Sequence, residues 1–170
     1  MTIIEKEILS EFYFGNITKK EFLKQFPVDL ANDENYIYNT FLDCYNRKDK
    51  YDLELVLALP PLGGKTIYAD KFVELLCLLL KEEWHQQHEN IVNCLNIIRS
   101  PKSIETLYST AFAKFDYLDY DDTYSLARKC IHALGNINTE ESKEKLRLLA
   151  KSEIPIIKEK AEKQLYYYKR

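Results

Sequence analysis

Apolar residues recur at every third or fourth position along most of the chain, a spacing that places them on one face of an α-helix. The first such run consists of Ile4, Ile8 and Phe12. Gly15 is a typical stop for this helix, because glycine adopts the left-handed conformation in which many helices end. Thr18 and Glu21 have the spacing of a capping box and predict a second helix, which must end before Pro27. The chain is therefore expected to open with a helical hairpin.

The same spacing predicts a third helix over about 33–48. Its apolar face consists of Ile37, Thr40, Phe41, Cys44 and Tyr45. Leu53, Val56 and Leu57 favour a fourth helix, but 53–59 also fits a β-strand.

The clearest break in the chain is 60–64, where two prolines and two glycines disfavour any regular element. A long helix is predicted over 67–83. Gly63 to Thr66 resembles part of a phosphate-binding loop, but that motif needs a glycine where this chain has Leu59. The segment is therefore interpreted as a connection between helices. We divide the chain into an N-terminal helical segment, 1–66, and a helical stack, 67–170, within one continuous domain.

After Trp84 the helical pattern becomes a recurring unit. The apolar faces of its first two helices are formed by Ile91, Cys94, Leu95 and Ile98, and then by Ile104, Leu107, Tyr108, Ala111 and Phe115. Ser100 and Pro101 are expected as the N-cap and the first residue of the second of these helices. The two helices are predicted to pair in antiparallel fashion.

The unit then repeats. Asp121 or Asp122 is expected to cap a helix that carries Ala127, Cys130, Ile131 and Leu134 and stops at Gly135. Asn138 or Thr139 is expected to cap the next helix, which carries Leu146, Leu149 and Ala150. A final helix has Pro155 in its first turn, where the missing N–H of proline does no harm.

The stretch from Leu126 to Ile137 resembles the second helix and exit turn of a HEAT repeat, which typically places a small residue before Ala-Leu-Gly. The pattern returns 31 residues later, with Cys130 and Ala161 in register, and a fainter copy around Cys94 precedes it. The resemblance covers about 85–168. It implies an all-α fold, namely a short right-handed α-solenoid of stacked antiparallel helix pairs with an N-terminal helical cap. In that family the second helices line the concave face, here the helices that begin near His85, Asp122 and Ile154.

Composition narrows the function classes. With 24 basic and 27 acidic residues the net charge is −3, which provides no general attraction for a nucleic acid. The four cysteines stand far apart in apolar helical register, so we interpret them as buried free thiols of a reducing compartment. No apolar stretch resembles a signal peptide or a membrane span, and a cytoplasmic location is expected.

The predicted partner surface joins three polar groups, each of which also has a purely structural explanation. Asp119, Tyr120 and Asp121 belong to an acidic, tyrosine-rich turn that would suit a basic partner, although one aspartate is needed as a helix cap. The other candidates are Arg128 and His132 on the following helix, and Trp84, His85 and Glu89 at the start of the repeats. Arg128 and His132 also fit a solvated helix face, and Trp84 also fits a core position.

The pair His85 and His88, with Glu82 and Glu89 nearby, has the spacing of metal ligands on a helix. No third histidine is close in sequence, so neither a metal nor a cofactor is predicted.

No segment carries a specific catalytic motif. We therefore predict a non-enzymatic module for protein–protein interaction, and the resemblance extends this to the bacterial HEAT-like immunity proteins that neutralise toxins. The alternative is a helical-repeat enzyme, either a base-excision DNA glycosylase or a chromophore lyase. A basic concave groove would favour the glycosylase, and a deep apolar pocket that holds a cysteine or an acid would favour the lyase. A scaffold that builds its own oligomer through an end of the stack is a third possibility.

Overall fold

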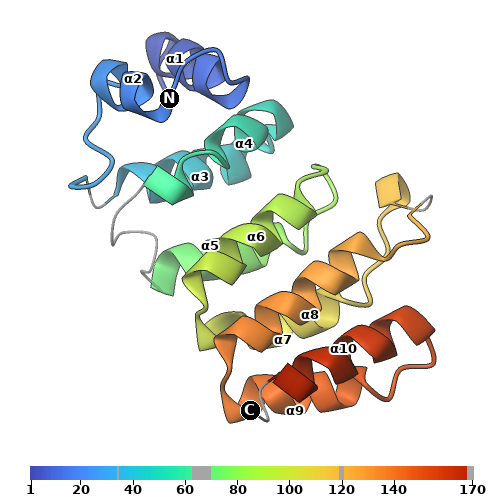
Figure 1. The fold of residues 1–170 in the computed structure, drawn as a ribbon. Helices are drawn as coiled ribbons and strands as arrows, with labels where there is room; N and C mark the ends of the chain where they lie inside the picture. Colours follow the sequence, from blue (N-terminus) through green and yellow to red (C-terminus); the bar gives the residue numbers. More distant parts are fainter. Residues whose placement is uncertain (34, 63–69, 119–120, 168–170) are drawn as a thin grey trace. The chain divides into compact units, whose positions relative to one another are not determined.

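The computed structural model describes residues 1–33, 35–62, 70–118 and 121–167. All regular elements in these ranges are helices, and none of the described residues forms a strand (Figure 1). The region that fitted either a helix or a strand, 53–59, begins in the second half of α4 (Lys50–Val56) and contains no strand, so the all-α prediction is confirmed. None of the described helices is long and apolar enough to span a membrane. The glycine-rich residues 63–66, and with them the predicted boundary between 66 and 67, lie outside the described residues.

The chain forms two compact units, Met1–Leu75 and Leu76–Arg170, and the division falls within α5 (Asp70–Leu79). The first unit begins with the predicted hairpin of α1 (Ile3–Tyr13) and α2 (Lys19–Gln25). Thr18 and Glu21 form the expected capping box, and Thr2 and Glu5 form another. Gly15 follows α1 with a φ of 76°, which is the conformation expected of a glycine stop.

The predicted apolar face of α1 is partly wrong. Leu9 is fully buried, whereas Ile4 is 63% exposed. The main packing partners of α1 are α2 and α4, and Leu9 is the apolar residue of α1 that is buried against them. Phe12 keeps an inward role through its ring contact with Phe22, whose centroid lies 4.7 Å away.

The remainder of the first unit consists of α3 (Tyr36–Arg47), α4 and the start of α5. Phe41 on α3 meets Phe72 on α5 edge to face, with 5.1 Å between ring centroids. Asp52 is buried and forms ion pairs with Lys6 of α1 at 2.6 Å and with Arg47 of α3 at 2.7 Å. Two cations therefore compensate this buried carboxylate.

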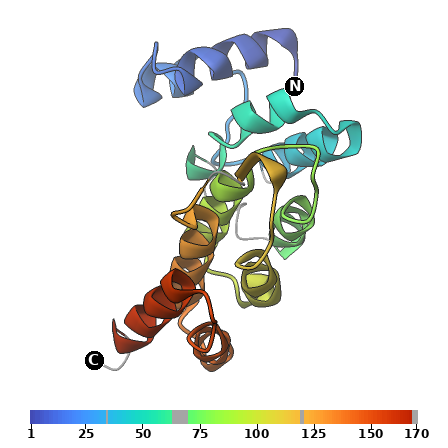
Figure 2. The same ribbon diagram turned by 90° about the vertical axis from the view of Figure 1, so that its right-hand side faces the viewer.

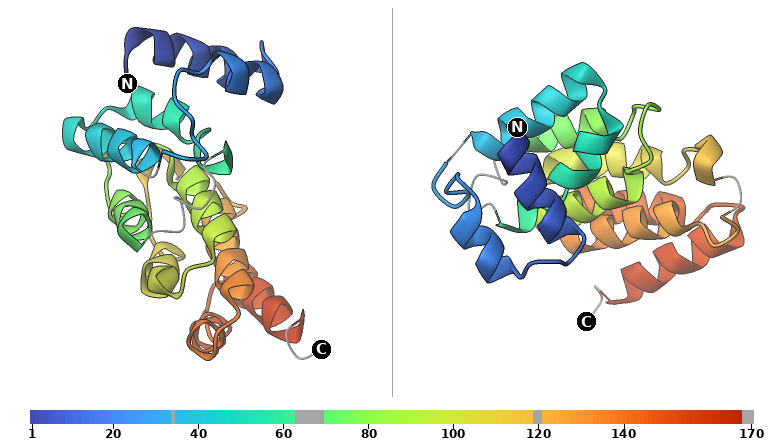
Figure 3. Two further views of the ribbon diagram at one scale, coloured as in Figure 1. Left: turned by 90° about the vertical axis from the view of Figure 1, so that its left-hand side faces the viewer. Right: turned by 90° about the horizontal axis from the view of Figure 1, so that it is seen from above.

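The second unit contains α6 (His88–Ile98), α7 (Ile104–Thr110), α8 (Ser125–Ile137), α9 (Glu140–Leu149) and α10 (Pro155–Tyr167). The helices form two rows: α6, α8 and α10 lie side by side in one, and α7 and α9 lie side by side in the other (Figures 2 and 3). Within each successive pair, α7 runs antiparallel to α8 and α9 antiparallel to α10 (Figure 1). Helix α8 is central because it packs on all four of the others.

Most of the predicted helix starts in this unit are confirmed. Ser100 caps a short 3₁₀ turn with Pro101 in its first position, and this turn leads directly into α7. Thr139 caps α9, and Asn138, the other candidate, instead ends α8 in the left-handed conformation. Helix α8 therefore runs two residues past Gly135, and the predicted stop there is wrong. Gly135 is buried within the helix.

The small residues that set the register of the repeat, Cys94, Cys130 and Ala161, are all buried. They lie on α6, α8 and α10, the three helices of one row. The cysteines are free thiols as predicted, and burial raises the pKa of both Cys94 and Cys130. Cys77 is the exception to full burial, with an intermediate exposure.

Candidate functional site

His85, which was predicted on the partner surface, and His88 lie in the interior of the second unit with exposures of 1% and 0%. Nε2 of His85 lies 3.0 Å from the carbonyl oxygen of Leu79, and Nδ1 accepts the backbone N–H of Gln87 at 3.1 Å. A nitrogen beside a carbonyl must carry the proton, and a nitrogen that accepts an N–H must not. His85 is therefore neutral, with its proton on Nε2.

His88 has the same tautomer. Its Nε2 lies 2.9 Å from the carbonyl oxygen of Glu82, and its Nδ1 lies 2.9 Å from the hydroxyl of Tyr117. Burial, together with the neighbouring His85, lowers the pKa of His88 to about 4. Both Nδ1 lone pairs are thus engaged by protein donors and are not available to a metal.

Aromatic rings enclose this pair of histidines. The ring of Phe115 stacks on His88 with centroids 3.6 Å apart, and Trp84 meets His85 edge on at 4.8 Å. Nε1 of Trp84 is buried without a hydrogen-bond partner among the described residues. The cluster joins the chain after α5, which ends at Leu79 rather than at the predicted residue 83, to the chain after α7. The N–H of His85 binds the carbonyl of Leu79, the last residue of α5, and the N–H of His88 binds the carbonyl of Glu82 in the chain that follows.

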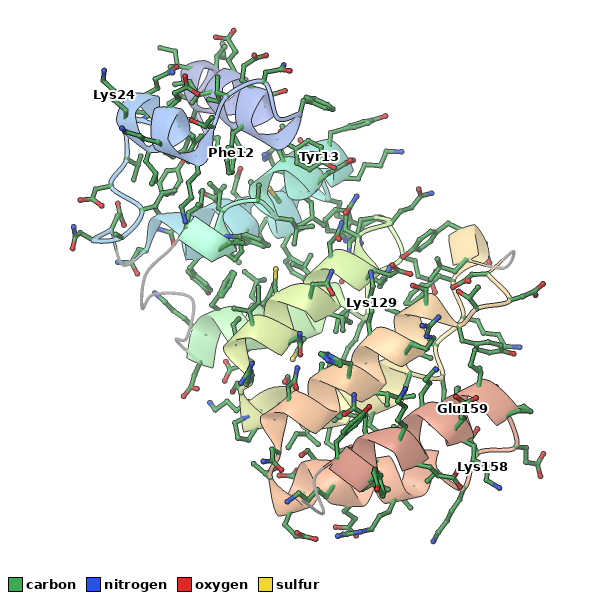
Figure 4. All side chains as sticks on the ribbon, viewed as in Figure 1. Phe12, Tyr13, Lys24, Lys129, Lys158 and Glu159 are labelled. Atoms are coloured by element: carbon green, nitrogen blue, oxygen red, sulfur yellow. The ribbon has the colours of Figure 1, made fainter. Side chains whose placement is uncertain are left out.

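Glu89 does lie near the surface, but it has a partner within the unit. Its Oε2 is 2.6 Å from Nζ of Lys129, and this ion pair links α6 to α8. Figure 4 labels Lys129 on α8.

A groove of about 400 Å³ runs over the face made by α6, α8 and α10, and we refer to it as the basic groove. Among the residues that line it are six in equivalent positions, one residue before and two residues after each small buried residue: Asn93, Asn96, Lys129, His132, Lys160 and Lys163. Arg128 lines it as well. Two of the predicted site residues, Arg128 and His132, therefore come together here.

The charge of the basic groove is positive. Among the described residues Arg128 and Lys163 form no ion pair, and both are exposed. Lys129 and Lys160 are paired with Glu89 at 2.6 Å and Glu159 at 3.4 Å. None of the described residues that line the groove is an aspartate or a glutamate.

Amide side chains organise the floor of the basic groove. Nδ2 of Asn136 donates to Oδ1 of Asn96 at 2.7 Å and lies 3.3 Å from Nδ1 of His132. Since an amide N–H must meet a lone pair, Nδ1 of His132 is the acceptor, and the N–H of the neutral ring is on Nε2. Polar contacts between α6 and α8 thus hold His132 in place.

The acidic turn is only partly described, because Asp119 and Tyr120 lie outside the described residues. The N-cap of α8 is Tyr124, so the prediction that Asp121 or Asp122 occupies that position is wrong. The side chain of Asp121 still supports the start of the helix, because its Oδ2 accepts the N–H of Ser125, the first residue of α8, at 2.7 Å. Its Oδ1 accepts from the backbone N–H of Thr123 at 3.0 Å and from the Thr123 hydroxyl. These bonds lower the pKa of Asp121, and the bond from the Thr123 hydroxyl has the largest effect. Asp122 is exposed.

A second pocket, of about 320 Å³, lies beside this turn, between the end of α7 and the first turns of α8 and α10. We refer to it as the Tyr124 pocket. Its apolar wall includes Phe112, Phe115, Leu118, Tyr124, Ile154 and Ile157. Asp121, Asp122 and Lys114 are the charged residues among those described that line it.

The sequence analysis missed Lys160 and Lys163. The signal was present, because the 31-residue offset that relates Cys130 to Ala161 also relates Lys129 to Lys160 and His132 to Lys163. The repeat was identified from its apolar and small residues, and the polar residues beside them follow the same offset.

Comparisons of the chain with protein families, with curated proteins and with solved structures found no match. Function is therefore inferred from the geometry of the basic groove and of the Tyr124 pocket.

Proposed function

We propose that this protein is a non-enzymatic binding module whose basic groove holds an acidic segment of a partner protein. One observation carries the proposal: three neighbouring helices direct polar side chains from the same two register positions into one groove, with cations on α8 and α10 and no carboxylate among the described lining residues. A groove with one sign of charge favours a partner of the opposite sign and speeds its association.

Protein is favoured over nucleic acid because the supply of cations is small. Within the described ranges Arg128 and Lys163 form no ion pair, and Lys129 and Lys160 are already paired with carboxylates. Tight duplex binding draws on roughly six to ten phosphate contacts. The amides of Asn93 and Asn96, and the hydroxyl of Tyr167, add hydrogen-bonding groups that suit the backbone and carboxylates of a peptide.

We further propose that the helix pairs of the second unit are HEAT repeats of a short right-handed solenoid. Support comes from the antiparallel pairs α7–α8 and α9–α10, the common row of α6, α8 and α10, and the buried small residues in register. In this proposal the basic groove is the concave face. The proposal includes an immunity protein that neutralises a toxin. In that case an acidic region of the toxin, and not a basic one, would bind in the basic groove.

The enzymatic alternatives each find one supporting feature. The positive groove fits a DNA glycosylase, but none of its described lining residues supplies the carboxylate that such an enzyme uses. The Tyr124 pocket holds acids, as a lyase pocket would, but Asp121 is already committed to three hydrogen bonds. Binding without chemistry therefore has the stronger support.

The test uses two fluorescent probes, a glutamate-rich peptide and a DNA duplex of equal net charge, titrated at low and high salt. We expect the peptide to bind more tightly, and we expect the double change Arg128→Glu and Lys163→Glu to abolish its binding. Lys151→Glu with Lys158→Glu is the matched control, because both lysines are exposed, neither lines the groove, and the change in net charge is the same. Equal losses in both variants would contradict the proposal, and tighter groove-dependent binding of the duplex would favour the glycosylase.

A further inference from the structure

The Tyr124 pocket leaves large aromatic side chains in contact with solvent. Phe112 is 43% exposed and Tyr124 is 41% exposed, and both line the same pocket. Buried below them are Ile157, Leu126 and Ala127. The volume, about 320 Å³, is at the lower end of the range for sites that take a small ligand or a single anchoring side chain.

The charge beside this apolar wall is not balanced. Asp121 and Asp122 line the pocket, and Lys114 is the one basic residue among its described lining. Asp121 remains ionised because its hydrogen bonds to Thr123 and Ser125 lower its pKa. Asp122 is exposed and has no capping bond among the described residues. An occupant with an apolar body and a positive charge would match both features.

The backbone of Tyr124 indicates that its ring is kept for a reason other than folding. Tyr124 precedes α8 with φ 53° and ψ 42°, the left-handed conformation, and its side chain makes no capping bond. That conformation is unfavourable for a bulky residue, and asparagine or glycine would adopt it more easily. The ring is nevertheless presented at the mouth of the pocket.

We propose that the Tyr124 pocket is a second binding site, which takes an apolar side chain of a partner protein flanked by a lysine or an arginine. The site is independent of the basic groove, since the two surfaces have opposite charge and share no lining residue. It would let one partner be held by both an acidic segment and a basic, apolar one.

The experiment uses three small probes of similar shape: 2-phenylethylammonium, phenylacetate and the neutral 2-phenylethanol. Amide chemical shifts of the labelled full chain report where each one binds. We expect the ammonium probe to shift the amides of Ala111, Ala113 and Ala127, the alcohol to bind about threefold more weakly, and phenylacetate to bind weakest. No shift at these amides, or equal affinity for all three probes, would overturn the proposal.

Two variants separate recognition from folding. Tyr124→Gly removes the ring and relieves the backbone, so the melting temperature should stay the same or rise while affinity for the ammonium probe falls about fivefold. Phe14→Ala is the control, because Phe14 is an exposed aromatic of the first unit and its loss should leave affinity unchanged. A lower melting temperature with unchanged affinity in Tyr124→Gly would show that the ring serves the fold. The titration with the glutamate-rich peptide tests the basic groove, so its result is independent of the result for the Tyr124 pocket.

Discussion

The hydroxyl of Tyr117 lies 2.9 Å from Nδ1 of His88, and it donates to the lone pair of the neutral ring. The other nitrogen of the ring, Nε2, donates to the carbonyl of Glu82 at 2.9 Å. A protonated ring would place its charge in a site shielded from water and beside His85, and both features disfavour it. The stability of the second unit is thereby linked to the protonation of a buried side chain.

We expect the protein to lose stability as the pH falls from 7 to 5. Burial lowers the pKa of His88 from 6.5 to about 4, so between these values the unfolded chain takes up a proton that the folded chain does not. Stability is therefore complete above about pH 6.5, and roughly 2 kcal/mol of it is lost by pH 5. His85, whose pKa is also lowered by burial, acts in the same direction. Urea unfolding at a series of pH values measures the effect.

Tyr117→Phe provides the control. Without the hydroxyl, the neutral form of His88 loses its donor, so stability at pH 7 should fall by about 1 kcal/mol and the further loss towards pH 5 should be smaller. Wild-type stability that is level from pH 7 to 5 would contradict this account of the histidine pair.

The two neighbouring aspartates of the acidic turn should differ sharply. Asp121→Ala removes the acceptor of the first N–H of α8 and should lower the free energy of unfolding by about 1 kcal/mol. Asp122→Ala changes an exposed residue and should stay within about 0.5 kcal/mol of the wild type. Thermal melts of the two variants, which have the same net charge, compare them directly. Equal stability of the two variants would show that the side chain of Asp121 does not support the start of α8.

Cys130 should tolerate a smaller residue better than a larger one. It is fully buried on α8, the helix that packs on four others, so the added carbons of Cys130→Leu should overpack the contact and cost about 1–3 kcal/mol. Cys130→Ala should cost less. A denaturant series on both variants measures the difference, and equal costs would mean that the helices do not approach closely at this position.

Glu89→Gln should strengthen binding in the basic groove. Glu89 neutralises Lys129 through their 2.6 Å ion pair, so its removal frees a groove cation at a cost in stability of less than about 1 kcal/mol. Affinity for the glutamate-rich peptide should rise at low salt, and the gain should shrink at high salt. Glu153→Gln, an exposed residue outside the groove lining, gives the same charge change as a control. An equal rise in both would indicate a general charge effect.

The sequence predicted the features that depend on neighbouring residues. The capping box at Thr18 needs only residues three apart, and Pro101 at the start of a helical turn needs only the residue before it. The stop at Gly135 was wrong because a glycine within a helix and one at its end look alike until the packing on α8 is known.

The candidate site was harder to predict because its contacts are distant in sequence. His88 reads as polar and metal-like, yet its environment comes from Phe115 and Tyr117, which belong to a different connection. The basic groove depends on the lateral packing of α8 and α10, and from the sequence alone Lys163 is one lysine among many on a polar helix.

The regular placement of groove and core positions has a consequence for how such a protein can change. Lys129 and Lys160 are lining residues of the groove, and each directly precedes a residue, Cys130 or Ala161, that is buried. If the groove binds a partner as we propose, a substitution at the lining position changes what the groove contacts, while the buried neighbour that packs the helices stays the same. The lining of the groove could then change residue by residue while the core of the second unit is retained.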